Sequence, residues 1–345
     1  MTDTPIGIFA FGTSPIEQMP EERTRALLAE AALQGARLML FSTADCDPET
    51  GCIKASRWSR RGWVKEEADL PRVVMIITNP ITARHHEIDR WLRASTRVVG
   101  FYNHTKLEFA DLMQTSPWAE YLVPTAKLTP ESVKDELTEW LRGGGTVVKP
   151  ADGNRGLGIH FAIPDSGGWT LTRESKSWRG TLSDIVARLE SNIRGRMQYR
   201  DYLAQRYIDS RDTDGRPAAI RVDIMQRPAG GWDVFRIAYR VASPTALVGN
   251  TRLGGADGLI EPFLARRKVR NPVEIQEEAL MLAKGAADTL NCNPGTEPNF
   301  AYGIDLAIDR DDRLWLIEAN GQPQASRFQH SFAIPAIAYL LSRAA

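Results

Sequence analysis

The stretch YGIDLAIDRDDRLWLIEANGQP, residues 302–323, is the most informative part of the sequence because it has the pattern of two apolar strands around the polar turn DRDD. A turn centred within DRDD places Asp305 opposite Leu316, and directly opposed residues share a face of the sheet. Because side chains alternate along a strand, Leu316 shares its face with Glu318 and Asn320. The hairpin therefore predicts one surface that carries Asp305, Glu318 and Asn320.

This predicted surface has the composition of a metal site. Two carboxylates and one amide oxygen form a hard donor set, which suits Mg²⁺, with Mn²⁺ as a substitute, when phosphates complete the coordination shell. The alternative is an ordinary solvated strand face. We favour the metal site because the opposite face is predicted to be buried and apolar, through Ile304, Ile308, Trp315 and Ile317.

A second informative stretch is VVKPADGNRGLGI, residues 147–159. Gly153, Gly156 and Gly158 allow backbone N–H groups to converge on phosphate oxygens, and Lys149 adds positive charge. Taken alone, the pattern also fits a plain hairpin turn with a salt-bridged lysine. A P-loop is excluded because no Gly-Lys-Ser/Thr follows, and a dinucleotide fingerprint is excluded because the glycines precede a strand pattern where that motif needs a helix.

The first hundred residues have an α/β pattern. Apolar strands are predicted at residues 6–12, 36–42 and 73–78, and a helix is predicted over 21–35, where Gly35 ends it. Units of this kind bind ligands at their strand ends. The basic and aromatic segment 57–67 is interpreted as a solvated hairpin.

The remainder of the chain alternates helices and strands after a domain boundary that we place near residue 100. Helices are expected over residues 105–114, over 181–193 with Thr181 as the cap, and over 272–290.

The overall composition limits the partners. The chain has 345 residues, with 43 Lys plus Arg against 43 Asp plus Glu, so no global basic field is available for nucleic acid or an anionic membrane. Three scattered cysteines form neither a disulfide framework nor a zinc motif. The N-terminus lacks the pattern of a signal peptide, and we expect a cytoplasmic protein. The sequence does not indicate an oligomeric state.

Taken in order, these stretches resemble the ATP-grasp superfamily, in particular its YheC/YheD group and, more distantly, RimK-like ligases. The resemblance covers most of residues 100–325. It implies an α/β protein with an α+β ATP-grasp fold: a pre-ATP-grasp α/β domain at 1–100 and an ATP-grasp domain at 101–345. The latter would consist of a glycine-loop lid at about 104–203 and a metal-binding subdomain at about 204–345. The matching stretches are VVKPADGNRGLGI, YLAQRYID, DGRPAAIRVDIMQ, RVASPTALVGNTRLGG and YGIDLAIDRDDRLWLIEANGQP.

The resemblance also implies a nucleotide site. Lys106 and Lys149 would contact the phosphates of ATP, and Asp209 would contact the ribose. The glycine loop would close over the phosphates, and a hinge segment would bind adenine through its backbone. The loop residues are Gly153, Arg155, Gly156 and Gly158, and the hinge residues are Gln205, Arg206, Tyr207 and Ile208.

Three further residues are implied at the reaction centre. Arg221 matches the family arginine near the transferred phosphate, and Asn250 and Arg252 match a loop that lines the reaction site. The implied metal ligands are the three hairpin residues identified above. One position departs from the family pattern, because relatives often have an acidic residue two before this arginine and the present chain has Ala219.

The function implied is a carboxylate–amine ligase that uses ATP and Mg²⁺, forms an acylphosphate and releases ADP and phosphate. Its amine acceptor would be an amino acid, a peptide or a protein tail. Two alternatives remain open: an ATP-binding coat or assembly protein without turnover, and an ATP-dependent small-molecule kinase. Amine dependence of product formation separates the ligase from the kinase.

Overall fold

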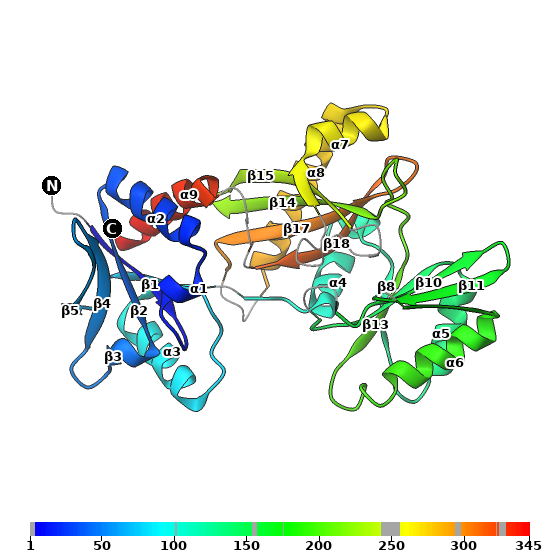
Figure 1. The fold of residues 1–345 in the computed structure, drawn as a ribbon, viewed down its shortest axis with the longest axis horizontal. Helices are drawn as coiled ribbons and strands as arrows, with labels where there is room; N and C mark the ends of the chain where they lie inside the picture. The colour runs from blue at the N-terminus through cyan, green and yellow to red at the C-terminus, as the bar shows by residue number, and fades with distance from the viewer. Residues whose placement is uncertain are drawn as a thin grey trace.

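Three β-sheets form the protein. The computed structural model describes residues 4–345 except 101, 154–156, 175, 243–255, 294–297, 322 and 324–328. The sheets follow one another along the longest axis, with the N-terminal sheet at one end and the second sheet at the other (Figure 1). Within the described ranges, no helix combines the length and apolarity needed to cross a bilayer.

The first sheet has seven strands in a mixed arrangement, in which the neighbouring strands β2-β1-β6-β7 run parallel to one another. The strands are β1 (Thr4–Ala10), β2 (Ala36–Ser42), β3 (Cys46–Asp47), β4 (Cys52–Ser59), β5 (Gly62–Asp69), β6 (Val73–Ile76) and β7 (Arg97–Val99). The accompanying helices are α1 (Pro15–Gln18), α2 (Glu21–Leu33) and α3 (Ala83–Ser95). The predicted strands, the helix and the β4–β5 hairpin are confirmed. Gly35, at φ +74°, ends the α2 segment in a conformation that suits glycine.

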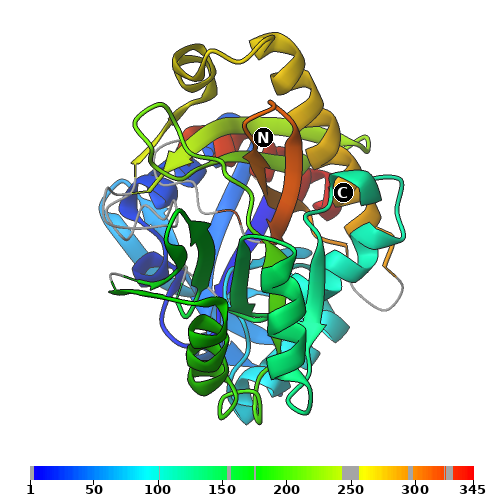
Figure 2. The same cartoon turned by 90° about the vertical axis from the view of Figure 1, so that its right-hand side faces the viewer.

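The second sheet, with its two helices, is called the lid. Its strand order is β12-β11-β10-β9-β13-β8. The strands are β8 (Thr125–Leu128), β9 (Thr146–Pro150), β10 (His160–Asp165), β11 (Gly168–Arg173), β12 (Lys176–Gly180) and β13 (Tyr202–Arg206). The helices α5 (Val133–Arg142) and α6 (Leu182–Ile193) bury their apolar sides against this sheet and stand in front of its strands in Figure 2. Thr181 caps α6 through a capping box, as predicted.

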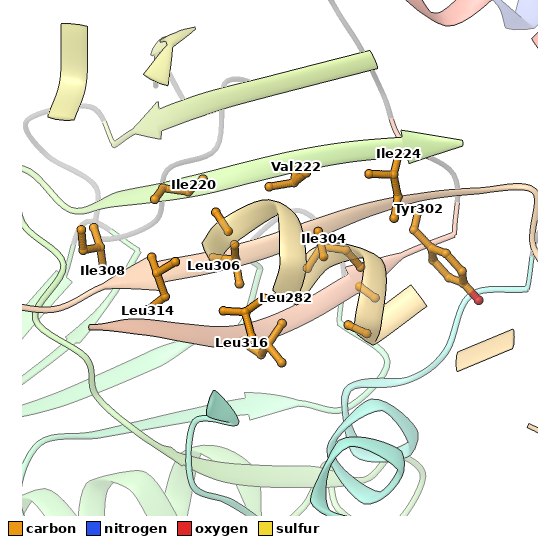
Figure 3. Close-up of a cluster of buried hydrophobic side chains, with 14 of the residues drawn as sticks. Ile220, Val222, Ile224, Leu282, Tyr302, Ile304, Leu306, Ile308, Leu314 and Leu316 are labelled. Carbon is orange, nitrogen blue, oxygen red and sulfur yellow. The ribbon is translucent and has the colours of Figure 1, made fainter. Parts of the chain in front are cut away.

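The third sheet has the order β16-β15-β14-β17-β18. The strands are β14 (Ala218–Gln226), β15 (Trp232–Val241), β16 (Ala256–Leu259), β17 (Ala301–Ile308) and β18 (Leu314–Asn320). The remaining helices are α4 (Lys106–Gln114), α7 (Ile260–Arg267), α8 (Pro272–Asn291) and α9 (Gln329–Ala344). Side chains of β14, β17 and β18 pack against α8, which contributes Leu282 to this core (Figure 3). Each such buried aliphatic side chain contributes about 1.5–3 kcal/mol relative to exposure, which leaves the opposite face of the sheet for polar residues.

Two helices pack across the boundaries that were predicted from the sequence. The predicted lid began near residue 104, yet α4 packs through Phe109 and Met113 into the core of the third sheet. The predicted metal-binding subdomain included the C-terminus, yet α9 packs with α2 against the N-terminal sheet as well as against β14 and β15 of the third sheet. In both cases an apolar helix face is buried against an element distant in sequence.

The predicted register of the β17–β18 hairpin is wrong. Asp305 pairs with Glu318, and Leu306 pairs with Leu316, because a β-bulge at Ile317 shifts the register between these pairs. Trp315 does not lie on the Ile304 and Ile308 face as predicted. Leu314 and Leu316 occupy that face instead.

Candidate active site

The bulge brings the three predicted hairpin residues together on the polar face of the third sheet. Asp305 and Glu318 are direct cross-strand partners, and Asn320 pairs with Gly303 at the next position on that face. The Asn320 Nδ2 donates a hydrogen bond of 3.1 Å to Asp305 Oδ2. Two carboxylates and an amide therefore share one small surface. Among the described residues, no group of three or more His, Cys, Asp or Glu side chains is placed to hold a metal ion.

Arg221 lies beside this surface because β14 pairs with β17 and places Arg221 opposite Asp305. Its Nε is 2.7 Å from Asp305 Oδ1. The neighbouring glycine, Gly303, makes this approach feasible, since a Cβ at that position would lie 1.9 Å from Arg221 Nη1 and 2.7 Å from Asp223 Oδ1. The guanidinium thus occupies the space that a side chain at position 303 would take.

Lys106 connects the third sheet with the lid. It begins α4, immediately after the capping box formed by Thr105. Its Nζ lies 3.2 Å from Glu318 Oε2 and donates a 2.5 Å hydrogen bond to the carbonyl of Gly153, while its backbone N–H donates to the carbonyl of Ala151. One lysine therefore contacts both Glu318 and the start of the glycine loop.

Lys149 projects from β9 and is only 4% exposed. Its Nζ donates a 2.8 Å hydrogen bond to Gln205 Oε1, and the Gln205 amide donates in turn to Thr125 Oγ1 at 2.9 Å. Burial lowers the pKa of Lys149 to about 8, with Glu318 opposing this shift. Gln205, predicted as a hinge residue, thus acts through its side chain by positioning this buried lysine.

The two carboxylates differ in their electrostatic balance. Burial alone would raise the pKa of Glu318, but Lys106, Lys149 and Arg221 outweigh it and lower the pKa to about 2. Burial raises the pKa of Asp305 from its ordinary value, with Arg221 the main opposing charge. The site is therefore a compact set of anions held by three cations.

Two backbone N–H groups of the predicted hinge are already hydrogen-bonded within the protein. The N–H of Arg206 donates to the carbonyl of Pro124, and the N–H of Tyr207 donates to the carbonyl of Gly145. The Arg206 side chain stacks over Trp140, away from the hinge backbone. Any nucleotide contact through this segment must use other groups.

Asp209, the predicted ribose contact, lies at the end of this segment. Its carboxylate forms salt bridges with Arg211 Nε at 2.9 Å and with Arg310 Nη2 at 2.6 Å. Burial opposes ionisation of Asp209, but these arginines outweigh it and lower its pKa. The described part of the structure thus gives Asp209 two internal partners.

Four other predicted residues, Arg155, Gly156, Asn250 and Arg252, lie outside the described residues. At the two ends of the glycine loop, Gly153 N–H donates to the carbonyl of Pro150, and Gly158 has φ +74°. The latter conformation accounts for a glycine at 158.

A set of charged residues that was not predicted from the sequence extends the polar face toward β16. Asp223 is fully buried and accepts a 2.5 Å hydrogen bond from Arg236 Nε, and Arg236 Nη1 lies 3.2 Å from Asp257 Oδ2. Arg240 lies beside them on β15. The signal was present, because Arg221 and Asp223 are two residues apart and Arg236 and Arg240 are four apart, which places each pair on one strand face.

The fold resembles that of solved structures over nearly the whole chain. D-cycloserine synthetase DcsG matches with a TM-score of 0.57 at 16% identity, covering 98% of each chain. D-alanyl-alanine synthetase A from Vibrio cholerae matches with a TM-score of 0.56 at 12% identity, covering all of this chain and 98% of that one. These likenesses, together with the family match below, identify the ATP-grasp fold.

Sequence comparison specifies the family. A model of the YheC/D-like ATP-grasp family matches residues 96–341. The chain belongs to the YheC/D-like ATP-grasp family. Endospore coat-associated protein YheD of Bacillus subtilis is 25% identical over 348 residues, covering 94% of this chain and 74% of the relative. The resemblance inferred from the sequence is confirmed.

Proposed function

We propose that the protein is an ATP- and magnesium-dependent carboxylate–amine ligase that forms an amide through an acylphosphate and releases ADP and phosphate. The observation that supports this most is the meeting of Lys106 and Lys149 with Asp305 and Glu318 where the lid faces the third sheet. Phosphate-binding cations and metal-binding anions are needed side by side wherever the terminal phosphate of ATP is transferred.

The donor set fits magnesium or manganese. Asp305, Glu318 and Asn320 would hold the ion, since their oxygens are hard donors on adjacent strands. Both carboxylates already face cations of the protein, Arg221 and Lys106, so this surface accepts positive charge. When bound, a divalent cation would neutralise charge on the terminal phosphates.

The protein residues supply position and charge. Lys106 and Lys149 hold the phosphates, and Arg221 neutralises charge on the phosphoryl group as it moves to the carboxylate. The amine then attacks the acylphosphate carbonyl carbon, and phosphate leaves with one oxygen of the original carboxylate. Correct alignment of the two reactants accounts for much of the rate, so the protein needs no nucleophile of its own.

The adenine contacts follow from the hinge backbone. Arg206 donates its N–H to Pro124, and proline has no N–H with which to return a bond, so the Arg206 carbonyl is left as an acceptor on that side. We assign the adenine amino group to this carbonyl and the ring nitrogen to the N–H of Ile208. Asp209 would contact the ribose after its salt bridge with Arg211 or Arg310 breaks.

The names of the neighbours agree with a joining reaction, because both solved structures are called synthetases. A direct test is a screen of amino acids and short peptides for phosphate release that requires both ATP and Mg²⁺. The proposal expects ADP as the product and, with ¹⁸O in the substrate carboxylate, label in the released phosphate. Production of AMP and pyrophosphate, or amide formation without label transfer, would overturn it.

A second function has support in the name of YheD, which is called coat-associated. A coat protein that binds ATP without turnover would show magnesium-dependent ATP binding and no phosphate release with any substrate of the screen. A kinase would release ADP without an amine and yield a stable phosphorylated product.

A further inference from the structure

Arg240 is a largely buried cation that has no carboxylate within hydrogen-bond distance among the described residues. On β15 it pairs with Ala219 of β14 and Asp257 of β16, and its side chain is 19% exposed. Its Nη1 is 3.7 Å from Asp305 Oδ1, which is beyond hydrogen-bond distance. Its Nε is buried and has no hydrogen-bond partner in the part of the chain that the structure describes.

The other two arginines of this face have closer carboxylate partners than Arg240 has, although Arg221 Nε and Arg236 Nη2 also lack a hydrogen bond of good geometry among the described residues. Arg236 bonds both Asp223 and Asp257, and Arg221 lies 2.7 Å from Asp305. The aspartates that face Arg240 are therefore already committed to other cations. Burial lowers the pKa of Arg240, and the nearby Arg221 lowers it further. Because an arginine stays charged at all ordinary pH values, this site favours the arrival of an anion.

The order of the strands indicates which anion this is. Glu318 and its lysine partner lie at β18, Arg221 and Asp305 occupy the two central strands, and Arg240 lies beyond them on β15. On the proposed function, a nucleotide whose phosphates contact Lys106 would have its terminal phosphate near Arg221. Arg240 is the next cation along the sheet, on the side away from Lys106.

We propose that Arg240 binds the carboxylate of the donor substrate and holds it beside Arg221 for phosphoryl transfer. This inference rests on the proposed function. Ala219, directly opposite Arg240 on β14, has no polar group and leaves the guanidinium edge available. The site thus selects a donor that is anionic when it binds, and a neutral ester or amide of the same molecule is rejected because it leaves Arg240 uncompensated.

The experiment uses acetate and succinate as probes, titrated by calorimetry into the protein saturated with ADP and Mg²⁺ and, separately, into the protein alone. Wild type is expected to bind at least one probe at millimolar concentration, and Arg240→Gln is expected to weaken that binding roughly tenfold or more. Ala219→Asp should weaken it similarly by providing Arg240 with an internal partner, whereas Ala219→Ser should not. Affinity for ADP should stay within about twofold of wild type in all three variants.

Ala219→Asp retains the arginine, so the test remains decisive even if Arg240→Gln does not fold. Arg266→Gln, which removes an exposed arginine of α7, is the matched control and should bind both probes as wild type does. The inference is overturned if neither probe binds wild type or if Arg240→Gln and Ala219→Asp bind as tightly as wild type. Failure of the wild-type protein to bind ADP would refute the proposed function instead. In that case the titration of the probes without nucleotide still tests whether Arg240 binds a carboxylate.

Discussion

Arg221 and Asp305 face each other across two adjacent strands, with Nε 2.7 Å from Oδ1, and together they form the centre of the polar face. The pair is buried, so removing one partner leaves an uncompensated charge. Both residues therefore influence stability as well as ligand binding, and variants here need both measurements.

Asp305→Asn and Glu318→Gln are expected to abolish the increase in ATP affinity that Mg²⁺ provides, because each removes an anionic ligand of the proposed metal. Calorimetric titration of ATP with and without Mg²⁺ measures this difference. Asp311→Asn, in the exposed turn of the same hairpin, is the control and should behave as wild type. Full magnesium dependence in either site variant would exclude that residue as a ligand.

The affinity for ATP should fall as the pH rises above about 8. The pKa of Lys149 is lowered by burial to about 8, so above this value free protein must take up a proton to present a charged lysine to phosphate. Affinity measured across this range, with proton uptake determined in buffers of different ionisation enthalpy, tests the expectation. Lys149→Arg remains charged and should remove the decline. A decline of equal size in that variant would show that another group titrates.

The same shift has a defined effect on folding. The pKa of Lys149 falls from 10.5 in the unfolded chain to about 8, so the unfolded state binds more protons between these values. The contribution of Lys149 to the free energy of unfolding therefore rises with pH across this window, and below it the charged lysine lowers stability.

Gly303→Ala should displace Arg221, since the added Cβ would lie 1.9 Å from Nη1. We expect a loss of about 1–3 kcal/mol in the free energy of unfolding and a weaker affinity for ATP with Mg²⁺. Urea unfolding of the Gly303→Ala, Arg221→Ala and double variants measures the coupling. If the clash with Arg221 outweighs the remaining 2.7 Å approach to Asp223 Oδ1, the double variant loses only a small part of the Gly303→Ala cost beyond Arg221→Ala. Additive losses would locate the strain elsewhere.

Gly285→Ala tests packing away from the site. Alanine normally favours a helix by about 1 kcal/mol over glycine. At this position in α8, however, a Cβ would lie 2.0 Å from the ring of Trp118, so we expect net destabilisation in urea unfolding. Gly195→Ala, where the added Cβ meets nothing within 4 Å, is the control and should be neutral or stabilising. Equal stability of both variants would contradict this account.

The sequence was sufficient to group Asp305, Glu318 and Asn320, although the register used for the prediction was wrong. Without the bulge at Ile317, Glu318 would lie on the same face as Leu316, in the core. The bulge therefore determines which face of the sheet carries Glu318, and a bulge cannot be read from the alternation of polar and apolar residues. Helices and strands with strong periodicity were predicted well, because the pattern is local.

Contacts between distant segments could not be predicted in the same way. No local feature of the sequence indicates that Lys106 reaches Glu318 or that Gln205 holds Lys149. The pairing of Asp223 with Arg236 depends on the register of β14 with β15, which a single sequence does not specify.

The position of α9 has a consequence for how the chain is made. The N-terminal sheet is covered by α3 on one face and by α2 together with α9 on the other, and α9 supplies Phe332, Ile337 and Leu340 to that core. On the ribosome the strands of this sheet emerge first, whereas α9 emerges after every other described element. The part of this face that α9 covers is therefore exposed while the lid and the third sheet are synthesised, and it is buried only once α9 has formed.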